Sequence, residues 1–246
     1  MDHDYSVLDR FGFERPPIGV KFLYDKPEGM ERLQEKRPLC MMLTHAHKGN
    51  AFYAGEEDHL CHGVFCLGGD IPPDYENGAV VAEVGQVADA RAGREVYRTL
   101  PRLPKGTVNY VAVAPLAKMT FDPDVMIFAG SIEQAEIILR ASTYTTGKLW
   151  TAKTSVVLGC AWFFAYPFIT GEVNYMVMGI NAGGMTAFKV LPVGTALVSV
   201  PFQQLPTVLT NLREMPWEHP QMPPQDMSEE FRSLMSGVAA LQAGGA

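Results

Sequence analysis

The order of the predicted strands constrains the fold of this chain more than any other feature. Seven short apolar segments are bounded by glycine, proline or polar residues, a pattern typical of β-strands. Convincing helices are fewer, and they do not alternate with the strands as they would in a doubly wound sheet. We therefore expect an α+β fold, a single domain with a mixed sheet and irregularly interspersed helices. The predicted strands are residues 16–24, 51–54, 108–114, 125–129, 155–158, 173–180 and 195–200.

The clearest helix follows the fourth of these strands. That strand is apolar throughout, which indicates burial on both of its faces. Ser131 after it is a suitable helix N-cap, and Gln134 stands where it completes a capping box, so we expect a helix over 131–143. The residues predicted to face the sheet are Ile132, Ala135, Ile138 and Leu139. Weaker patterns predict helices over 39–48, 92–100, 203–213 and 228–241.

Length and composition set the domain organisation. With 246 residues, of which 47% are hydrophobic, the chain can bury a large core, and we expect one domain over residues 1–225. Four prolines between residues 215 and 225 predict an extended linker to a C-terminal helical tail at 226–246. That tail could dock on a partner chain, which would give a homo-oligomer, or it could fray.

The net charge of the chain argues against some classes of binding partner. A formal net charge of −7, without any cluster of Lys or Arg, argues against binding to nucleic acid or to an anionic membrane surface. A small molecule or a partner protein is the better candidate. The N-terminus lacks the apolar region of a signal peptide, and no uninterrupted apolar run approaches the ~18 residues of a membrane span. We therefore expect a cytoplasmic protein.

Residues 38–70 concentrate the side chains that could carry chemistry. They hold three of the four cysteines and four of the six histidines. In a reducing compartment these cysteines are expected to be thiols or metal ligands rather than disulfides. Cys61 and Cys66 are five residues apart, which on a continuous α-helix places them roughly 140° apart around the axis. Both can serve one site only if the segment between them is not wholly α-helical.

The first functional interpretation is metal binding in a redox-related role. Sulfur and imidazole ligands suit an iron–sulfur cluster or a zinc ion, although the chain has no C-x-x-C pair of the kind that structural zinc sites show. The candidate ligands are Cys40, Cys61, Cys66, Cys160 and His47. We expect Cys61 and Cys160 to approach each other, because both begin glycine-flanked turns. Sulfurs more than ~8 Å apart would exclude a shared ion, since Zn–S bonds are only ~2.3 Å long.

Two further interpretations stay open. Buried cysteines often pack as small hydrophobes, so the chain could instead be a non-catalytic module that binds a small ligand or a partner. The aromatic run at 162–168 would then line its pocket, and Gly63, Gly183 and Gly184 are the candidate cofactor-binding residues. The third interpretation is a thiol enzyme in which a histidine activates Cys40 or Cys61. Whether the protein is an enzyme is left open.

The two histidines of the first predicted helix cannot both face one ion. His45 and His47 are two residues apart, so their side chains point roughly 200° from each other around the helix axis. His47 shares the face of Cys40, whereas His45 shares that of Met41. We therefore expect replacement of His47, but not of His45, to alter any metal content.

An ordered set of segments carries a resemblance to a known family. In chain order these are PPIGVKF, DHLCHGVFCLGG, VAPLAK, DPDVMIF, SIEQAEIILRASTYTTG, Cys160 before AYPFITG, and VPFQQL. From Pro16 to about Arg213 the chain resembles the uncharacterised family called domain of unknown function 169. The resemblance implies a single α+β domain and no established activity.

The resemblance also singles out individual positions. It places the recurrent cysteine of a C-x-G-G-like motif at Cys61, with Gly63 as the first glycine and Val64 where a second glycine is usual. It places the cysteine that precedes the Tyr-Pro-x-x-Thr-Gly element at Cys160. The segment 179–185, where the resemblance implies Cys or Arg, has neither residue.

Overall fold

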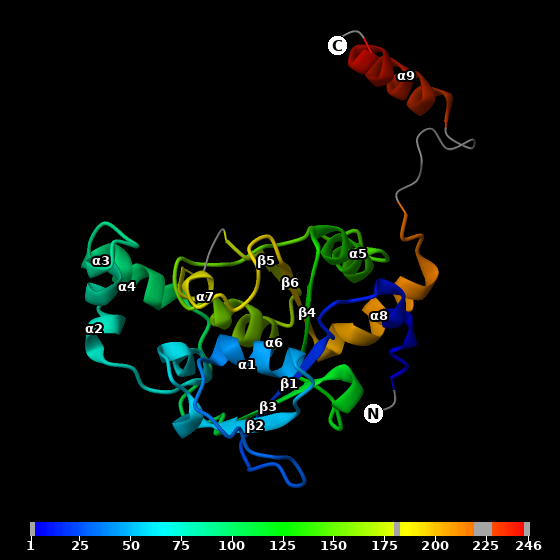
Figure 1. Cartoon of the computed structure of the whole chain (residues 1–246). Coiled ribbons are helices and arrows are strands. Elements are labelled where there is room, and N and C mark those ends of the chain that lie inside the picture. Colours follow the sequence, from blue (N-terminus) through cyan, green and yellow to red (C-terminus); the bar gives the residue numbers. More distant parts are fainter. Residues whose placement is uncertain (1–2, 180–182, 219–227, 244–246) are drawn as a thin grey trace. The chain divides into compact units, whose positions relative to one another are not determined.

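One antiparallel sheet organises the protein (Figure 1). The structure is a computed structural model that describes residues 3–179, 183–218 and 228–243. Its strand order is β2-β3-β1-β4-β6-β5, and each neighbouring pair is antiparallel. The predicted α+β class is thus confirmed, with an antiparallel sheet where we expected a mixed one. The strands are β1 Ile18–Leu23, β2 Phe52–Gly55, β3 Tyr110–Pro115, β4 Val125–Gly130, β5 Asn174–Val177 and β6 Ala196–Pro201.

Helices of different lengths cover the sheet and connect its strands. The α-helices are α1 Leu39–His47, α2 Pro73–Glu76, α3 Ala79–Glu83, α4 Ala90–Thr99, α5 Ile132–Thr143, α6 Tyr166–Thr170, α7 Gly183–Ala187, α8 Leu205–Glu214 and α9 Glu229–Ala243. The 3₁₀ turns are η1 Ser6–Phe11, η2 Glu56–Asp58, η3 His62–Leu67, η4 Leu116–Lys118 and η6 Phe202–Gln204, and η5 Ala161–Ala165 is a π-helix.

Both faces of the sheet are buried, as the apolar β4 strand predicts. Alternate residues of a strand point to opposite faces. Ile127 of β4 joins the core that also holds three of the cysteines, together with residues of α1, η3 and η5. Phe128 points to the other face, where it lies 6.0 Å from the ring of Phe13. On that face α5 packs against β4 and β6, and the Asn211 side chain of α8 donates a hydrogen bond to the Ala141 carbonyl of α5.

The helix predicted over 131–143 is confirmed, with one difference in its buried face. The Ser131 hydroxyl accepts a hydrogen bond from the Gln134 N–H, and the Gln134 side chain accepts one from the Ser131 N–H. Ala135, Ile138 and Leu139 are buried as predicted. Ile132 is 60% exposed, so its predicted burial is wrong. It is the first residue of α5, whereas the buried residues of this helix begin at Ala135.

The apolar segment 155–158 does not form the predicted strand. It runs as a loop into a helical turn at Gly159 and Cys160, which continues into the π-helix η5 and then α6. Pro167 accounts for the wider helix, because proline has no N–H to bond the carbonyl four residues earlier and its ring clashes with that carbonyl. The strand prediction failed because a short apolar run has the same pattern in a strand and in a buried loop.

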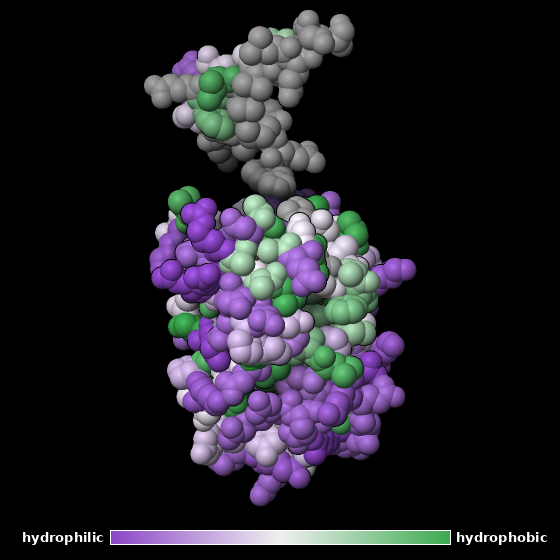
Figure 2. Space-filling view, turned by 90° about the vertical axis from the view of Figure 1, so that its left-hand side faces the viewer, coloured by the Kyte–Doolittle hydropathy of each residue, from purple (hydrophilic) through white to green (hydrophobic). Residues whose placement is uncertain are grey.

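A small group of helices, α2 to α4, closes one side of the first unit. Gly78, at φ +84°, and Gly93 pack backbone against backbone, and a Cβ on Gly93 would lie 2.4 Å from the Gly78 carbonyl oxygen. This close approach joins α3 to α4. Figure 2 views the molecule from the side where Figure 1 shows α2, α3, α4 and α7, and hydrophobic residues lie there among hydrophilic ones.

The chain divides into two compact units, Met1–Arg213 and Glu214–Ala246. The sheet belongs to the first unit. In the second unit, α9 lies at the position of the predicted C-terminal helix, and Phe231 and Leu234 on it are exposed. Most of the predicted proline-rich linker lies outside the described residues, as do residues 180–182 of the glycine-rich segment. Among the described helices none is long and apolar enough to cross a membrane.

Candidate functional site

All four cysteines of the chain converge in one place from three separate segments. Cys40 lies in the first turn of α1, Cys61 caps the start of η3, Cys66 lies near the end of η3, and Cys160 directly precedes η5. Three of them are buried, with exposed fractions of 6% for Cys40, 0% for Cys66 and 4% for Cys160. Cys61 is half-buried.

Gly63 is the point at which these segments meet. A Cβ on Gly63 would lie 3.2 Å from the Cys61 Sγ, 3.3 Å from the Cys160 Sγ and 3.0 Å from the Leu39 Cβ. The two sulfurs are therefore separated by no more than the sum of the first two distances, about 6.5 Å. The predicted approach of Cys61 and Cys160 is confirmed. Any larger residue at position 63 would push against both sulfurs, so the glycine permits the cluster.

The local conformation of η3 explains how Cys61 and Cys66 reach one site. Cys61 is extended, at φ −130° and ψ 172°, and a 3₁₀ turn replaces an α-helix after it. The Cys61 Sγ accepts a hydrogen bond from the Gly63 N–H, and the Cys66 Sγ donates one to the Gly63 carbonyl at 3.0 Å. The Cys66 and Cys160 side chains are hydrogen-bonded to each other. The segment between Cys61 and Cys66 is thus not wholly α-helical. This is the condition under which both cysteines can serve one site.

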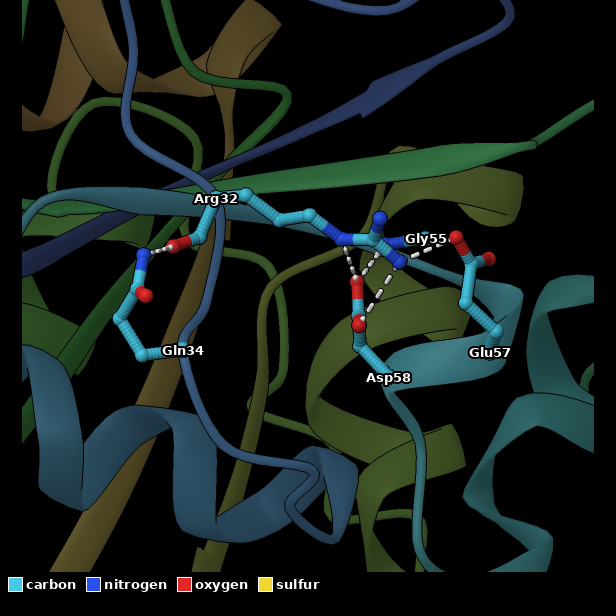
Figure 3. A network of polar contacts seen from close by, with 5 residues as sticks. All are labelled: Arg32, Gln34, Gly55, Glu57 and Asp58. Atoms are coloured by element: carbon cyan, nitrogen blue, oxygen red, sulfur yellow. Dashed lines mark hydrogen bonds and ion pairs between the residues drawn. The ribbon is translucent and has the colours of Figure 1, made fainter.

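An ion-pair network fixes the segment that delivers Cys61 (Figure 3). The Arg32 guanidinium donates two hydrogen bonds of 3.0 Å to the Asp58 carboxylate and also contacts Glu57. Asp58 accepts a further bond of 2.8 Å from the Gly55 N–H. Although burial opposes ionisation, the bonds from Arg32 and Gly55 hold the pKa of Asp58 below its usual value. The buried carboxylate is therefore an anchor and not a free acid or base.

The backbone beside Cys160 is strained. Leu158 has φ +49°, in the left-handed region, where a non-glycine residue pays on the order of 1 kcal/mol. The π-helix η5 begins two residues after Gly159. Strained φ angles and π-helical turns both concentrate at functional sites, because only a specific tertiary structure maintains them. Two independent backbone features thus mark the segment that carries Cys160.

A cavity of about 290 Å³ opens over the cysteine cluster. Cys40, Cys61 and Cys160 line one part of it. Its other walls come from α2, α4 and α7, which contribute aromatic and methionine side chains, and from the strained loop before Cys160. These further residues include Tyr75, Tyr97, Met185, Phe188, Val157 and Leu158.

The sequence did not identify the aromatic walls of this cavity. The run at 162–168 that we considered as a pocket lining is mostly core, with Phe163 and Phe164 fully buried. Tyr75 and Tyr97 come instead from short, polar helices. The one available signal was that Tyr97 lies four residues after Gly93, so that both share the buried face of α4.

The candidate cofactor-binding glycines lie at different places. Gly63 is at the centre of the cysteine cluster. Gly183 and Gly184 begin the five-residue helix α7, and Gly184 lines the cavity over the cysteines. A Cβ on Gly184 would meet no atom within 4 Å, so this position does not require glycine for close packing.

The structure does not bring His47 to the cysteine cluster. Cys40 and His47 share a face of α1 but stand seven residues apart, a rise of roughly 10 Å along the axis. Both ring nitrogens of His47 are buried and have no hydrogen-bond partner among the described residues. Burial, and to a smaller extent the charge of Arg15, lowers the pKa of His47 to about 4. The prediction of His47 as a ligand rested on the helix face that it shares with Cys40 and did not consider the distance between them along the helix.

The other three histidines of the 38–70 segment have separate surroundings. His45 packs its ring against Phe52, with centroids 5.1 Å apart. His59 is held by the bridge to Arg37, and burial lowers its pKa to about 4. His62 lines the cavity over the cysteines, and its ring lies tilted against that of Tyr75, with centroids 3.8 Å apart.

The surroundings of Cys40, Cys61 and Cys160 raise the pKa of each of these three thiols, which favours the protonated form. Burial raises the pKa of Cys40, and proximity to Cys160 and Cys61 raises it further. Burial likewise raises the pKa of Cys61. The hydrogen bond with Cys66, together with burial, raises the pKa of Cys160. A nucleophilic cysteine needs a lowered pKa, so this arrangement does not favour thiolate catalysis.

The cysteine sulfurs are suitable ligands for a soft metal, but their present arrangement is not that of a metal site. Thiolate sulfur is the preferred ligand of iron–sulfur clusters and a common ligand of zinc. Among the residues that the structure describes, no three Cys, His, Asp or Glu side chains are arranged to hold a metal ion. The thiols instead contact one another and the Gly63 backbone.

Comparison with known proteins places the chain in a family. No curated protein and no solved structure matches it. A family model described as "Uncharacterised ArCR" and named domain of unknown function 169 matches residues 8–211. The matched range contains the whole sheet and all four cysteines. The chain therefore belongs to the domain of unknown function 169 family.

Proposed function

We propose that this protein binds a soft metal ion or an iron–sulfur cluster through Cys40, Cys61, Cys66 and Cys160, and that it acts in a redox-related role. The observation that carries the proposal is the convergence of every cysteine in the chain on one site. Buried cysteines pack well as isolated small hydrophobes, so packing alone gives no reason for four of them to gather from three segments. Four thiols are also the number that iron–sulfur clusters and structural zinc sites use.

Loading would require the thiols to turn and lose their protons. A thiol that coordinates a metal is deprotonated, and the cation then compensates the charges that burial disfavours. The bonds now made to Gly63 and between Cys66 and Cys160 would be exchanged for metal–sulfur bonds. The metal would supply electron transfer or Lewis acidity, while the protein supplies the buried sulfur ligands and the adjoining cavity.

The test is metal analysis of the full chain purified without oxygen. We expect bound iron or zinc in the unaltered protein, and a brown colour if the metal is an iron–sulfur cluster. Cys61→Ser and Cys160→Ser should each lose most of the metal while circular dichroism shows an unchanged fold. His47→Gln is the matched control and should keep the metal, because His47 lies two helical turns from the cluster. Metal-free unaltered protein, or equal metal in all variants, would overturn the proposal.

The cavity favours a second candidate, a binding module whose thiols are inert. Aromatic and methionine side chains already surround the cavity. The raised pKa of Cys40 and of Cys61 is what we expect of thiols that neither react nor bind metal. A protein without metal that binds a small molecule equally well before and after Cys40, Cys61 and Cys160 are changed to serine would support this candidate against the first.

A further inference from the structure

The cavity over the cysteines differs in chemistry from the other cavities of the molecule. Among its described lining residues there is no Asp, Glu, Lys or Arg. A larger cavity beside α5 is lined by Lys148 and Glu172 together with several hydroxyl and amide side chains. A third, beside α1, is lined by arginine and glutamate side chains. The lack of permanent charge is therefore a property of this cavity and not of cavities in this protein generally.

We propose that this cavity binds an uncharged, planar aromatic molecule beside the cysteine sulfurs. The proposal goes beyond metal binding and does not depend on it. Burying a charged ligand without an opposite charge is strongly unfavourable, and the described walls offer none. A volume of about 290 Å³ is at the lower end for small-molecule sites, which suits a ligand of one or two fused rings.

The shape of the walls favours a flat ligand. Tyr75 of α2, Tyr97 of α4 and Phe188, which directly follows α7, surround the same space. Aromatic faces prefer offset or edge-on contacts with another ring, and each such contact adds to the gain from burial. Met185 and the three cysteines contribute sulfur atoms, which make favourable contacts with ring edges.

Two polar side chains give the cavity a means of orienting its ligand. His62 and Gln86 line the cavity, and both can hydrogen-bond a hydroxyl or carbonyl group on the ligand. Apolar walls with a small number of polar groups are the usual composition of small-molecule sites. The expected ligand is thus an uncharged aromatic ring with one hydrogen-bonding substituent.

The experiment compares 2-naphthol with 2-naphthoate by calorimetric titration of the full chain. The two probes share a ring system and differ in charge at neutral pH. We expect 2-naphthol to bind, and 2-naphthoate to bind at least tenfold more weakly. Phe188→Ala should weaken 2-naphthol binding about three- to tenfold, the range for one aromatic contact. Phe188 is 56% exposed, so its removal leaves the core intact.

Tyr24→Ala is the matched control. Tyr24 is 64% exposed and lies just beyond β1, away from the cavity walls, so binding should not change. Equal or stronger binding of 2-naphthoate would overturn the ligand class, and no binding of either probe would overturn the site. Equal effects of the two alanine variants would show that the probe binds elsewhere. Because metal content is measured separately, loss of either proposal leaves the other standing.

Discussion

Asp58 lies three residues before Cys61 and is the buried anchor of the loop that leads to it. Its side chain is 9% exposed, and its carboxylate joins Arg32 to the backbone N–H of Gly55. Next to it, the Arg37 N–H donates to the Asp58 carbonyl and the Leu60 N–H donates to the Arg37 carbonyl. Both side-chain and backbone hydrogen bonds thus join this loop to the segment 31–37.

Replacing Asp58 with alanine should lower the free energy of unfolding by about 2 to 3 kcal/mol, because hydrogen bonds to a buried charge are lost and the arginine is left without its main partner. Urea denaturation measures this difference. Glu57→Gln is the control, since Glu57 is 61% exposed and should change stability by less than about 0.5 kcal/mol. Similar losses from both variants would show that the buried position of Asp58 has no special role.

His47 should make the stability of the protein depend on pH. Its pKa is about 4 in the folded chain, against ~6.5 for an unfolded histidine, so the unfolded chain takes up a proton first as the pH falls. The stability associated with neutral His47 is fully present above pH ~6.5 and is lost as the pH falls through 4. Because the ring is partly exposed, we expect a loss of about 2 kcal/mol from this residue.

Two substitutions at His47 separate titration from burial. Both His47→Gln and His47→Leu should flatten the pH dependence of unfolding between pH 7 and 4, since neither side chain titrates. Only His47→Leu should also raise stability at pH 7, by about 1 kcal/mol, because it leaves no buried polar atom without a partner. An unchanged pH profile in both variants would assign the dependence to other groups.

α7 is the helix whose C-terminal cap a single substitution could most clearly stabilise. Its end has the hydrogen bonds of a Schellman motif, from the Val190 N–H to the Met185 carbonyl and from the Lys189 N–H to the Thr186 carbonyl. Lys189 takes the left-handed position, at φ +50°, where glycine is usual. The motif fixes the helix that places Met185 and Phe188 at the cavity.

Lys189→Gly should raise the free energy of unfolding by about 0.5 to 1 kcal/mol, since glycine adopts this conformation without the penalty of a Cβ. Lys189 is exposed, so little packing is lost. Lys189→Ala removes the same charge but keeps the Cβ, and thermal unfolding should show no gain for it. A gain for alanine equal to that for glycine would mean that the charge, and not the backbone, was responsible.

Elements with strong local patterns could be predicted from the sequence, and those held by tertiary contacts could not. The β4 strand and the Ser131 capping box follow from residue type alone. The loop at 155–158 could not be anticipated, because leucine almost never takes a positive φ unless its surroundings force it. For the site, the sequence indicated the four cysteines and the approach of Cys61 to Cys160. The residues that line the cavity could not be predicted from the sequence, since many of them come from short helices without an apolar pattern.

At the scale of the whole molecule, the division at Arg213 can be tested by truncation. The two units are compact, and the first contains the entire sheet. A chain that ends at Glu218 should unfold in one cooperative transition within about 2 °C of the full chain. Differential scanning calorimetry measures both midpoints. A fall of more than about 5 °C would mean that residues after 218 contribute to the stability of the first unit.

The spacing of the cysteines along the chain has a consequence for protein synthesis. Cys40, Cys61 and Cys66 leave the ribosome early, whereas Cys160 follows Cys66 by 94 residues. At ~5–20 residues per second this is a delay of roughly 5 to 20 s, and β6, which lies between β4 and β5 in the sheet, emerges later still. During that interval three thiols are present on an incomplete sheet that cannot bury them. The nascent chain is therefore more vulnerable to oxidants and stray metal ions than the finished protein.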